Sequence, residues 1–286
     1  MQPLYATHKW LVSALLLASV LLPATAPAVY ADAAMPAISI EAGYRQMYNL
    51  DFSGAHATFQ SWESSHPDDP LGPASNAAAY LFSEFDRLHI LQSELFTDND
   101  RFAKRGKLAP DPQMRSAFDA ELVKSDDIAG RILSLSPQNA NALFAKVLAD
   151  GLRGDYATMI EKRNLAGLGY LKAGRVMAQK LLALDPSYYD AYLAVGVENY
   201  LLGLSSAPVR WFLRMGGAET NKDDGVAKLR LTAEKGRYLA PYARLLLAVA
   251  ALRDHDRQTA SRLLSGLADE FPQNQLYREE LARLHP

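Results

Sequence analysis

A recurring pair of apolar runs near the C-terminus limits what this chain can fold into more than any other feature. In residues 241–274, the apolar run 245–252 is followed by a charged break at 253–256, and a second apolar run, 260–271, stops at Pro272. In residues 189–236 the opening residues have the same spacing, but 204–221 are inserted between the two runs. Apolar residues spaced three and four apart predict amphipathic helices. Because one such pair cannot bury its own apolar side, we expect several pairs stacked on one another.

The spacing of prolines and small residues resembles the tetratricopeptide repeat (TPR) family. A TPR unit has 34 residues, with a small residue at position 8 and a proline at position 32. When Pro67, Pro186 or Pro272 is placed at position 32, position 8 of its own or the following unit is small. The residues at that position are Gly43, Gly196 and Ala248. The unit ending at Pro137 departs from the pattern, with Ile132 where a small residue is usual.

The resemblance implies an all-α fold, a right-handed superhelical solenoid of about five TPR-like helix pairs with a C-terminal capping helix. We expect this repeat domain to occupy residues 38–286. Insertions are predicted near 97–112, which is polar, and near 204–221, which separates the two apolar runs of residues 189–236. A third is predicted near 151–164, because Pro137 and Pro186 are further apart than one 34-residue unit.

The N-terminal residues have the pattern of a secretory signal peptide. After Lys9, residues 10–22 carry no charge, and small residues follow up to an A-x-A-like site at 31–33. Such an apolar segment is too short to span a bilayer comfortably. We therefore expect 1–31 to be a signal peptide, 32–37 to be a flexible mature N-terminus, and the protein to be exported to the periplasm or secreted. An uncleaved anchor is the alternative.

Charge and cysteine content exclude several classes of function. The formal net charge is −2, with 30 basic and 32 acidic residues. The chain therefore lacks the excess of positive charge that is typical of proteins that bind nucleic acid. The chain has no cysteine, so it contains no disulfide and no lipid-anchoring cysteine.

No motif in the sequence points to catalysis. The six histidines are scattered without metal-ligand spacing, and there is no G-x-S-x-G elbow, phosphate-binding loop or cysteine nucleophile. We expect no catalytic residue, no metal and no cofactor. An enzyme built from residues far apart in sequence stays an alternative, because active sites are defined by geometry.

The candidate binding surface follows from the TPR resemblance. TPR proteins usually hold a partner against the first helix of each pair, and the matching positions here are apolar and aromatic. The lysine and asparagine residues with which some TPR cochaperones clamp a carboxylate are missing. The predicted partner-binding residues, including three from the 204–221 insertion, are Tyr44, Tyr48, Phe144, Leu193, Val197, Tyr200, Arg210, Trp211, Arg214, Tyr242 and Leu245.

Three interpretations of this apolar inner face remain open at this point. The main hypothesis is a non-catalytic protein-interaction or scaffolding module of the cell envelope that binds an apolar or aromatic segment of a partner. Alternatively, residues 204–217 cover the face, above the cleft of an enzyme or the closed pocket of a small-ligand carrier. The third interpretation is that this insertion contacts a membrane surface, although so short a segment would bind the membrane only weakly.

Overall fold

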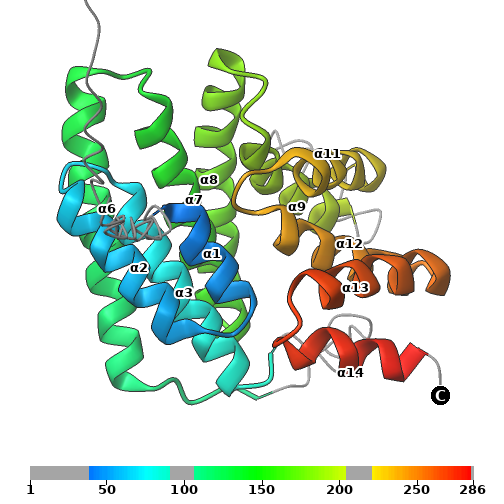
Figure 1. Ribbon diagram of the computed structural model, residues 1–286. Helices are drawn as coiled ribbons and strands as arrows, with labels where there is room; N and C mark the ends of the chain where they lie inside the picture. The colour runs from blue at the N-terminus through cyan, green and yellow to red at the C-terminus, as the bar shows by residue number, and fades with distance from the viewer. Residues whose placement is uncertain (1–38, 91–105, 204–220, 285–286) are drawn as a thin grey trace, which may run out of the picture. The chain divides into compact units, whose positions relative to one another are not determined.

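The residues that the structure describes form helices and loops, with no strand among them. The computed structural model describes residues 39–90, 106–203 and 221–284, all within the unit Ile38–Pro286 (Figure 1). The α-helices are α1 (Ile40–Tyr48), α2 (Phe52–Ser65), α3 (Leu71–Arg87), α6 (Pro112–Leu135), α7 (Ala140–Asp155), α8 (Asn164–Leu184), α9 (Tyr192–Gly203), α11 (Lys222–Lys235), α12 (Ala240–Arg253), α13 (Arg257–Glu270) and α14 (Gln275–Leu284). A π-helical turn, Tyr156–Ile160, follows α7, and a 3-10 turn, Tyr189–Ala191, precedes α9.

Local sequence signals set where most of these helices begin and end. A polar side chain at the N-terminus accepts a hydrogen bond from a backbone N–H two or three residues further on, which satisfies a group that the helix leaves unpaired. The residues that act in this way are Ser39, Asp51, Asp111, Asn139, Asn221 and Asp256. A proline lies two residues beyond the end of the second helix in four pairs, where it prevents continuation. These prolines are Pro67, Pro137, Pro186 and Pro272.

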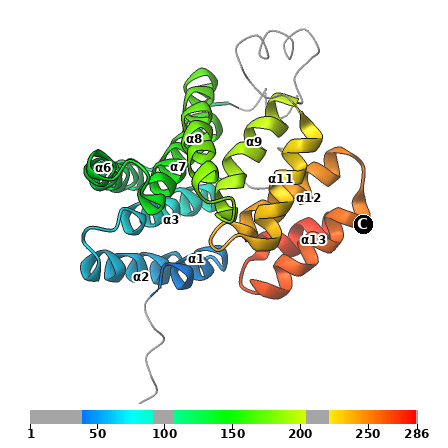
Figure 2. The same cartoon turned by 90° about the horizontal axis from the view of Figure 1, so that it is seen from above.

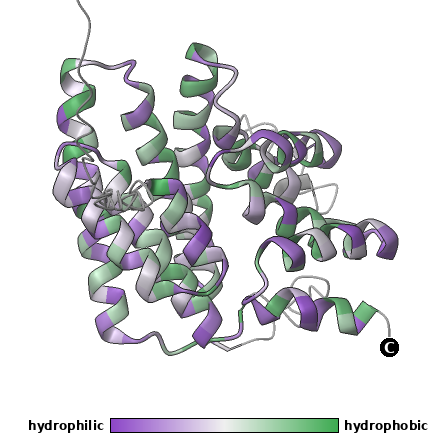
Figure 3. Ribbon diagram, in the orientation of Figure 1, coloured by the Kyte–Doolittle hydropathy of each residue, from purple (hydrophilic) through white to green (hydrophobic). Residues whose placement is uncertain are grey.

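The helices pack as successive antiparallel neighbours. Helix α2 contacts α1 and α3, α6 contacts α3 and α7, and α8 contacts α7 and α9 (Figure 2). The series continues through α11, α12 and α13 to α14. Figure 3 shows hydrophilic and hydrophobic residues alternating along most helices, as expected for amphipathic helices that share one apolar interior. The all-helical class and the packed helix pairs predicted from the sequence are thus confirmed for the described residues.

The first and last helix pairs contact each other directly. The Tyr48 hydroxyl donates to the backbone oxygen of Tyr238 at 3.2 Å, and the Asn274 side-chain amide donates to the backbone oxygen of Tyr48 at 2.8 Å. The Tyr48 ring also packs against Phe271, with centroids 5.7 Å apart. The C-terminal part of the array therefore packs against helix α1 at Tyr48.

Helix α7 is longer than the sequence predicts. A loop was expected from 151 onward, but α7 continues to Asp155 and then into the π-helical turn. Glycines at 151 and 154 lower the helix propensity, by roughly 1 kcal/mol each. Close packing outweighs this cost: a Cβ atom at Gly154 would lie 3.5 Å from Cβ of Tyr170 on α8. Leu152 and Ile160 on the same segment are buried.

Two further comparisons with the sequence expectations concern the insertions and the membrane. The 204–217 segment and most of the 97–112 segment lie outside the described residues. Within the part of the chain that is described, no helix combines the length and apolar character needed to cross a bilayer.

Candidate functional site

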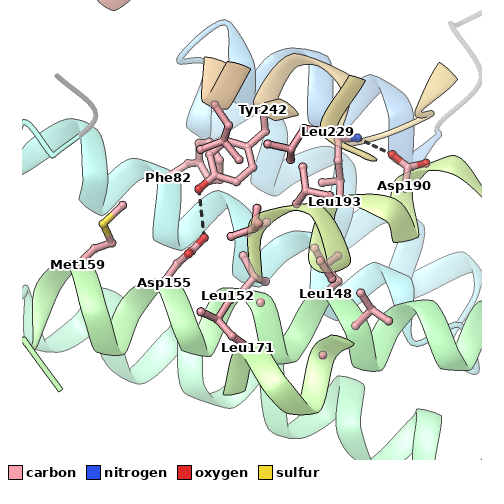
Figure 4. Close-up of a pocket in the computed structure, with 18 of the residues that line it drawn as sticks. Phe82, Leu148, Leu152, Asp155, Met159, Leu171, Asp190, Leu193, Leu229 and Tyr242 are labelled. Carbon is pink, nitrogen blue, oxygen red and sulfur yellow. Dashed lines mark hydrogen bonds between the residues drawn. The ribbon is translucent and has the colours of Figure 1, made fainter. Parts of the chain in front are cut away.

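The inner side of the helix array contains a cavity of about 180 Å³. Its wall is formed by α1, α3, α7, α8, α9, α11 and α12 and is mostly apolar (Figure 4). Leu148, Leu152 and Leu171 border one side, and Leu193 and Leu229 border another. The cavity therefore offers an apolar space bounded by helices that are distant in sequence.

One face of α12 borders the cavity over three helical turns. Tyr242, Leu246, Val249 and Arg253 all line it, at spacings of four, three and four residues. A rise of 1.5 Å per residue separates Tyr242 from Arg253 by about 16 Å along the helix axis. The cavity is thus elongated along α12, with a tyrosine and a guanidinium group at opposite ends of that helix face.

Asp155 is the polar group that distinguishes the Tyr242 end. The Tyr242 hydroxyl donates a hydrogen bond to Asp155 Oδ2 at 3.2 Å (Figure 4). Burial among apolar groups raises the pKa of the Asp155 carboxyl to about 7, although the bond from Tyr242 acts in the opposite direction. Burial and the neighbouring carboxyl also raise the pKa of Tyr242 well above its ordinary value. Near neutral pH, Asp155 consequently exists in both protonation states.

The π-helical turn positions Asp155 and its neighbour Tyr156 on different sides of the segment. The Glu161 N–H bonds to the Tyr156 oxygen at 3.2 Å, which closes the wider turn. Asp155 lines the cavity, whereas the ring of Tyr156 lies beneath the Arg115 guanidinium of α6, 4.2 Å from its centre. The turn therefore anchors Tyr156 outside the cavity, while Met159 of the same turn lines the cavity together with Asp155.

Asp190 also lines the cavity, but its hydrogen-bonding capacity is used by the fold. Its carboxyl accepts from the backbone N–H groups of Arg237, Tyr238 and Leu239 at 2.8, 3.0 and 2.8 Å. These bonds fix the segment that leads into α12 against the start of α9. Asp190 is therefore a structural group of the wall.

Gly151 leaves space at the cavity wall. It lines the cavity from α7, and a Cβ atom built there would meet no atom within 4 Å. A larger side chain at this position would extend the wall into the cavity without a backbone clash.

A second cavity, of about 120 Å³, lies on the other side of an aromatic partition. It shares Met47, Tyr48, Phe82 and Tyr242 with the first. The rings of Phe82 and Tyr242 meet edge to face, with centroids 5.3 Å apart. Aromatic side chains therefore separate the two spaces.

The structure brings most of the predicted partner-binding residues to these two cavities, where all are buried except Leu193 and Val197, which are partly exposed. Tyr44, Tyr48, Leu193, Val197, Tyr200 and Tyr242 line the larger cavity. Leu245 lines the smaller one. Phe144 lines neither and is fully buried, with its ring 4.9 Å from that of Tyr188. The remaining three, Arg210, Trp211 and Arg214, lie outside the described residues.

The sequence reasoning missed Asp155 and Gly151, because both fell in the predicted 151–164 loop. A periodic signal existed: Val147, Leu148, Gly151, Leu152 and Asp155 follow the spacing of one helix face. The two glycines obscured it.

The described residues contain no group of three or more histidine, aspartate or glutamate side chains that could hold a metal ion. Comparisons of the chain with protein-family models, with curated proteins and with solved structures found no match. Its function is therefore argued from the geometry of the site.

Proposed function

We propose that this protein binds a small, mainly apolar ligand in the cavity between α7, α9 and α12. The observation that carries the proposal is the cavity itself, a space of about 180 Å³ with an almost entirely apolar wall. An engineered protein cavity of about 150 Å³ with a similar lining stays dry and binds benzene. Transfer of apolar surface from water into such a space is favourable, by roughly 25 cal/mol per Å².

The wall also has the composition typical of ligand pockets. Such pockets combine apolar and aromatic side chains with a few polar groups that orient the ligand. Here the aromatic groups include Tyr48, Phe82 and Tyr242, and the polar groups are the Asp155 carboxyl and the Arg253 guanidinium. Binding without chemistry suits this arrangement, since the hydrogen-bonded neighbour of Asp155 among the described residues is a tyrosine, and its raised pKa makes it a poor proton donor.

Titration of the full chain with N-phenyl-1-naphthylamine, a neutral dye that fluoresces in apolar surroundings, tests the proposal. We expect saturable binding by the wild-type protein and its loss in Gly151→Leu, whose side chain would occupy the cavity. Gly266→Leu is the matched control, because a Cβ atom at this exposed glycine of α13 also meets nothing within 4 Å. Equal affinity of the two variants would refute the cavity as the binding site.

A partner's apolar segment is the second candidate occupant. It is favoured by the six predicted partner-binding residues that line the cavity. Because Tyr44 and Tyr48 are only 2% and 3% exposed, such a segment reaches them only if the helices separate. A partner retained from envelope extract by the full chain, and lost with both Tyr200→Ala and Gly151→Leu, supports this function. A partner set that neither change affects contradicts it.

We further propose that the helix pairs are TPR-like units in a right-handed superhelix, and that residues 1–31 direct export to the periplasm or the medium. The repeat assignment is supported by the prolines that follow four of the second helices at the same distance. N-terminal sequencing of the protein from its native host tests the export signal. A mature terminus between residues 32 and 34 is expected, and an intact Met1 would contradict it.

A further inference from the structure

We infer that the ligand of this cavity is an organic amine, whose protonated nitrogen pairs with the Asp155 carboxylate while its apolar body extends along α12. The inference rests on the proposed function and specifies the class of ligand. It depends on the position of Asp155 and on the partners that this residue has among the described residues.

Asp155 differs from the most deeply buried carboxylates among the described residues. Each of those is paired with a cation or with several N–H donors, as buried carboxylates require. The pairs are Glu63 with Lys124, Glu84 with Arg87, Glu198 with Arg175, Glu280 with Arg283, and Asp190 with three backbone N–H groups. Among the described residues, Asp155 receives only the single 3.2 Å hydrogen bond from Tyr242.

The surroundings of Asp155 disfavour a negative charge in the empty protein. The carboxyl is enclosed by protein atoms, and the residue keeps part of its surface accessible where it lines the cavity. An ionised Asp155 is therefore unstable until a cation reaches it from the cavity.

Among the described residues, no titratable wall group near Asp155 supplies that cation. The others that line the wall there are five tyrosines, Asp190 and Arg253. Asp190 is held by three N–H groups, and Arg253 is about 16 Å from Tyr242 along α12. A primary amine has an ordinary pKa near that of lysine, about 10.4, so it arrives protonated. Its hydrogen bond to the carboxylate is charge-assisted, which makes it stronger than a neutral one.

Calorimetric titration of the full chain with two ligands of similar shape tests this inference. The ligands are 2-phenylethylamine and 2-phenylethanol, measured at about pH 8, where Asp155 is largely ionised. A hydrogen bond to a charged group contributes roughly 1.5–3 kcal/mol, so we expect the amine to bind at least about tenfold more tightly. Asp155→Asn should abolish this preference and leave the affinity for the alcohol unchanged. Asp223→Asn, at an exposed aspartate of α11, is the control and should retain the preference.

The outcomes separate this inference from the proposed function. Equal binding of amine and alcohol by the wild-type protein, or a preference that survives Asp155→Asn, would overturn the amine assignment and leave the cavity as an apolar binding site. Failure of both ligands and of N-phenyl-1-naphthylamine to bind would overturn the proposed function as well. The amine affinity should also fall between about pH 8 and about pH 5 in the wild-type protein, because Asp155 takes up a proton over that range, and it should stay level in Asp155→Asn.

Discussion

Replacing Asp155 with Asn should make the folded protein more stable above neutral pH and change the way its stability depends on pH. The substitution keeps the shape of the side chain and an oxygen that can accept the bond from Tyr242. It removes the charge that the apolar surroundings disfavour.

The size of the effect follows from the two pKa values of the carboxyl group. Burial raises the pKa from its ordinary value of about 3.8 to about 7 in the folded state. Between these values the folded protein holds a proton that the unfolded chain has released, so the free energy of unfolding falls as pH rises, by about 1.4 kcal/mol per unit. Over this pH range the free energy of unfolding of the wild-type protein therefore falls by up to about 4 kcal/mol because of Asp155, and at higher pH this contribution stays constant.

Urea unfolding of the wild-type protein and Asp155→Asn at several values between about pH 4 and about pH 8 measures this directly. Burial also raises the pKa of Asp86, Glu121 and Asp190, and these groups affect both proteins alike. The difference between the two curves therefore isolates Asp155. We expect the free energy of unfolding of the variant, relative to that of the wild-type protein, to rise steadily up to about pH 7. If the two curves of stability against pH are parallel, Asp155 is not a buried carboxyl without a cationic partner.

Four other substitutions test the packing around the two cavities. Asp190→Ala removes the acceptor of three backbone N–H groups and should lower the free energy of unfolding by about 3 kcal/mol in urea titrations, with Asp223→Ala close to neutral. Gly225→Ala should also destabilise, because its Cβ atom would lie 2.6 Å from the Tyr200 nitrogen. Gly151→Ala should instead stabilise the protein by up to about 1 kcal/mol, because its Cβ atom meets nothing within 4 Å and alanine favours the helix. The thermal midpoint should rise accordingly. Asn274→Ala should cost about 1–3 kcal/mol and speed amide hydrogen exchange in α1, because it releases the backbone oxygen of Tyr48; unchanged exchange there would contradict the contact between the first and last pairs.

The helix pairs could be predicted from the sequence because local signals define them. Pro67, Pro137, Pro186 and Pro272 end second helices where the pattern placed them, and the apolar runs between them became helices. These signals act over a few residues, so they are visible in one sequence without knowledge of the tertiary structure.

The enclosed interior could not be predicted in the same way. The bond between Tyr48 and Tyr238 joins residues 190 positions apart, and no local pattern encodes such a contact. The TPR resemblance assigns Tyr44 and Tyr48 to the inner face, and contacts with Tyr238 and Phe271, which are distant in sequence, bury them there. Asp155 was hidden for a related reason, since tertiary packing of α7 on α8 overrides the low helix propensity of Gly151 and Gly154.

Crystals of the full chain exposed to xenon gas provide the most direct test of the apolar cavity. Xenon enters dry apolar cavities, and its electron density is strong enough to locate it without a synthetic ligand. We expect a xenon site bordered by Leu152, Leu193 and Tyr242 in the wild-type protein, and none in Gly151→Leu. A cavity closed by side chains in the crystal, or xenon density equal in both proteins, would contradict the account.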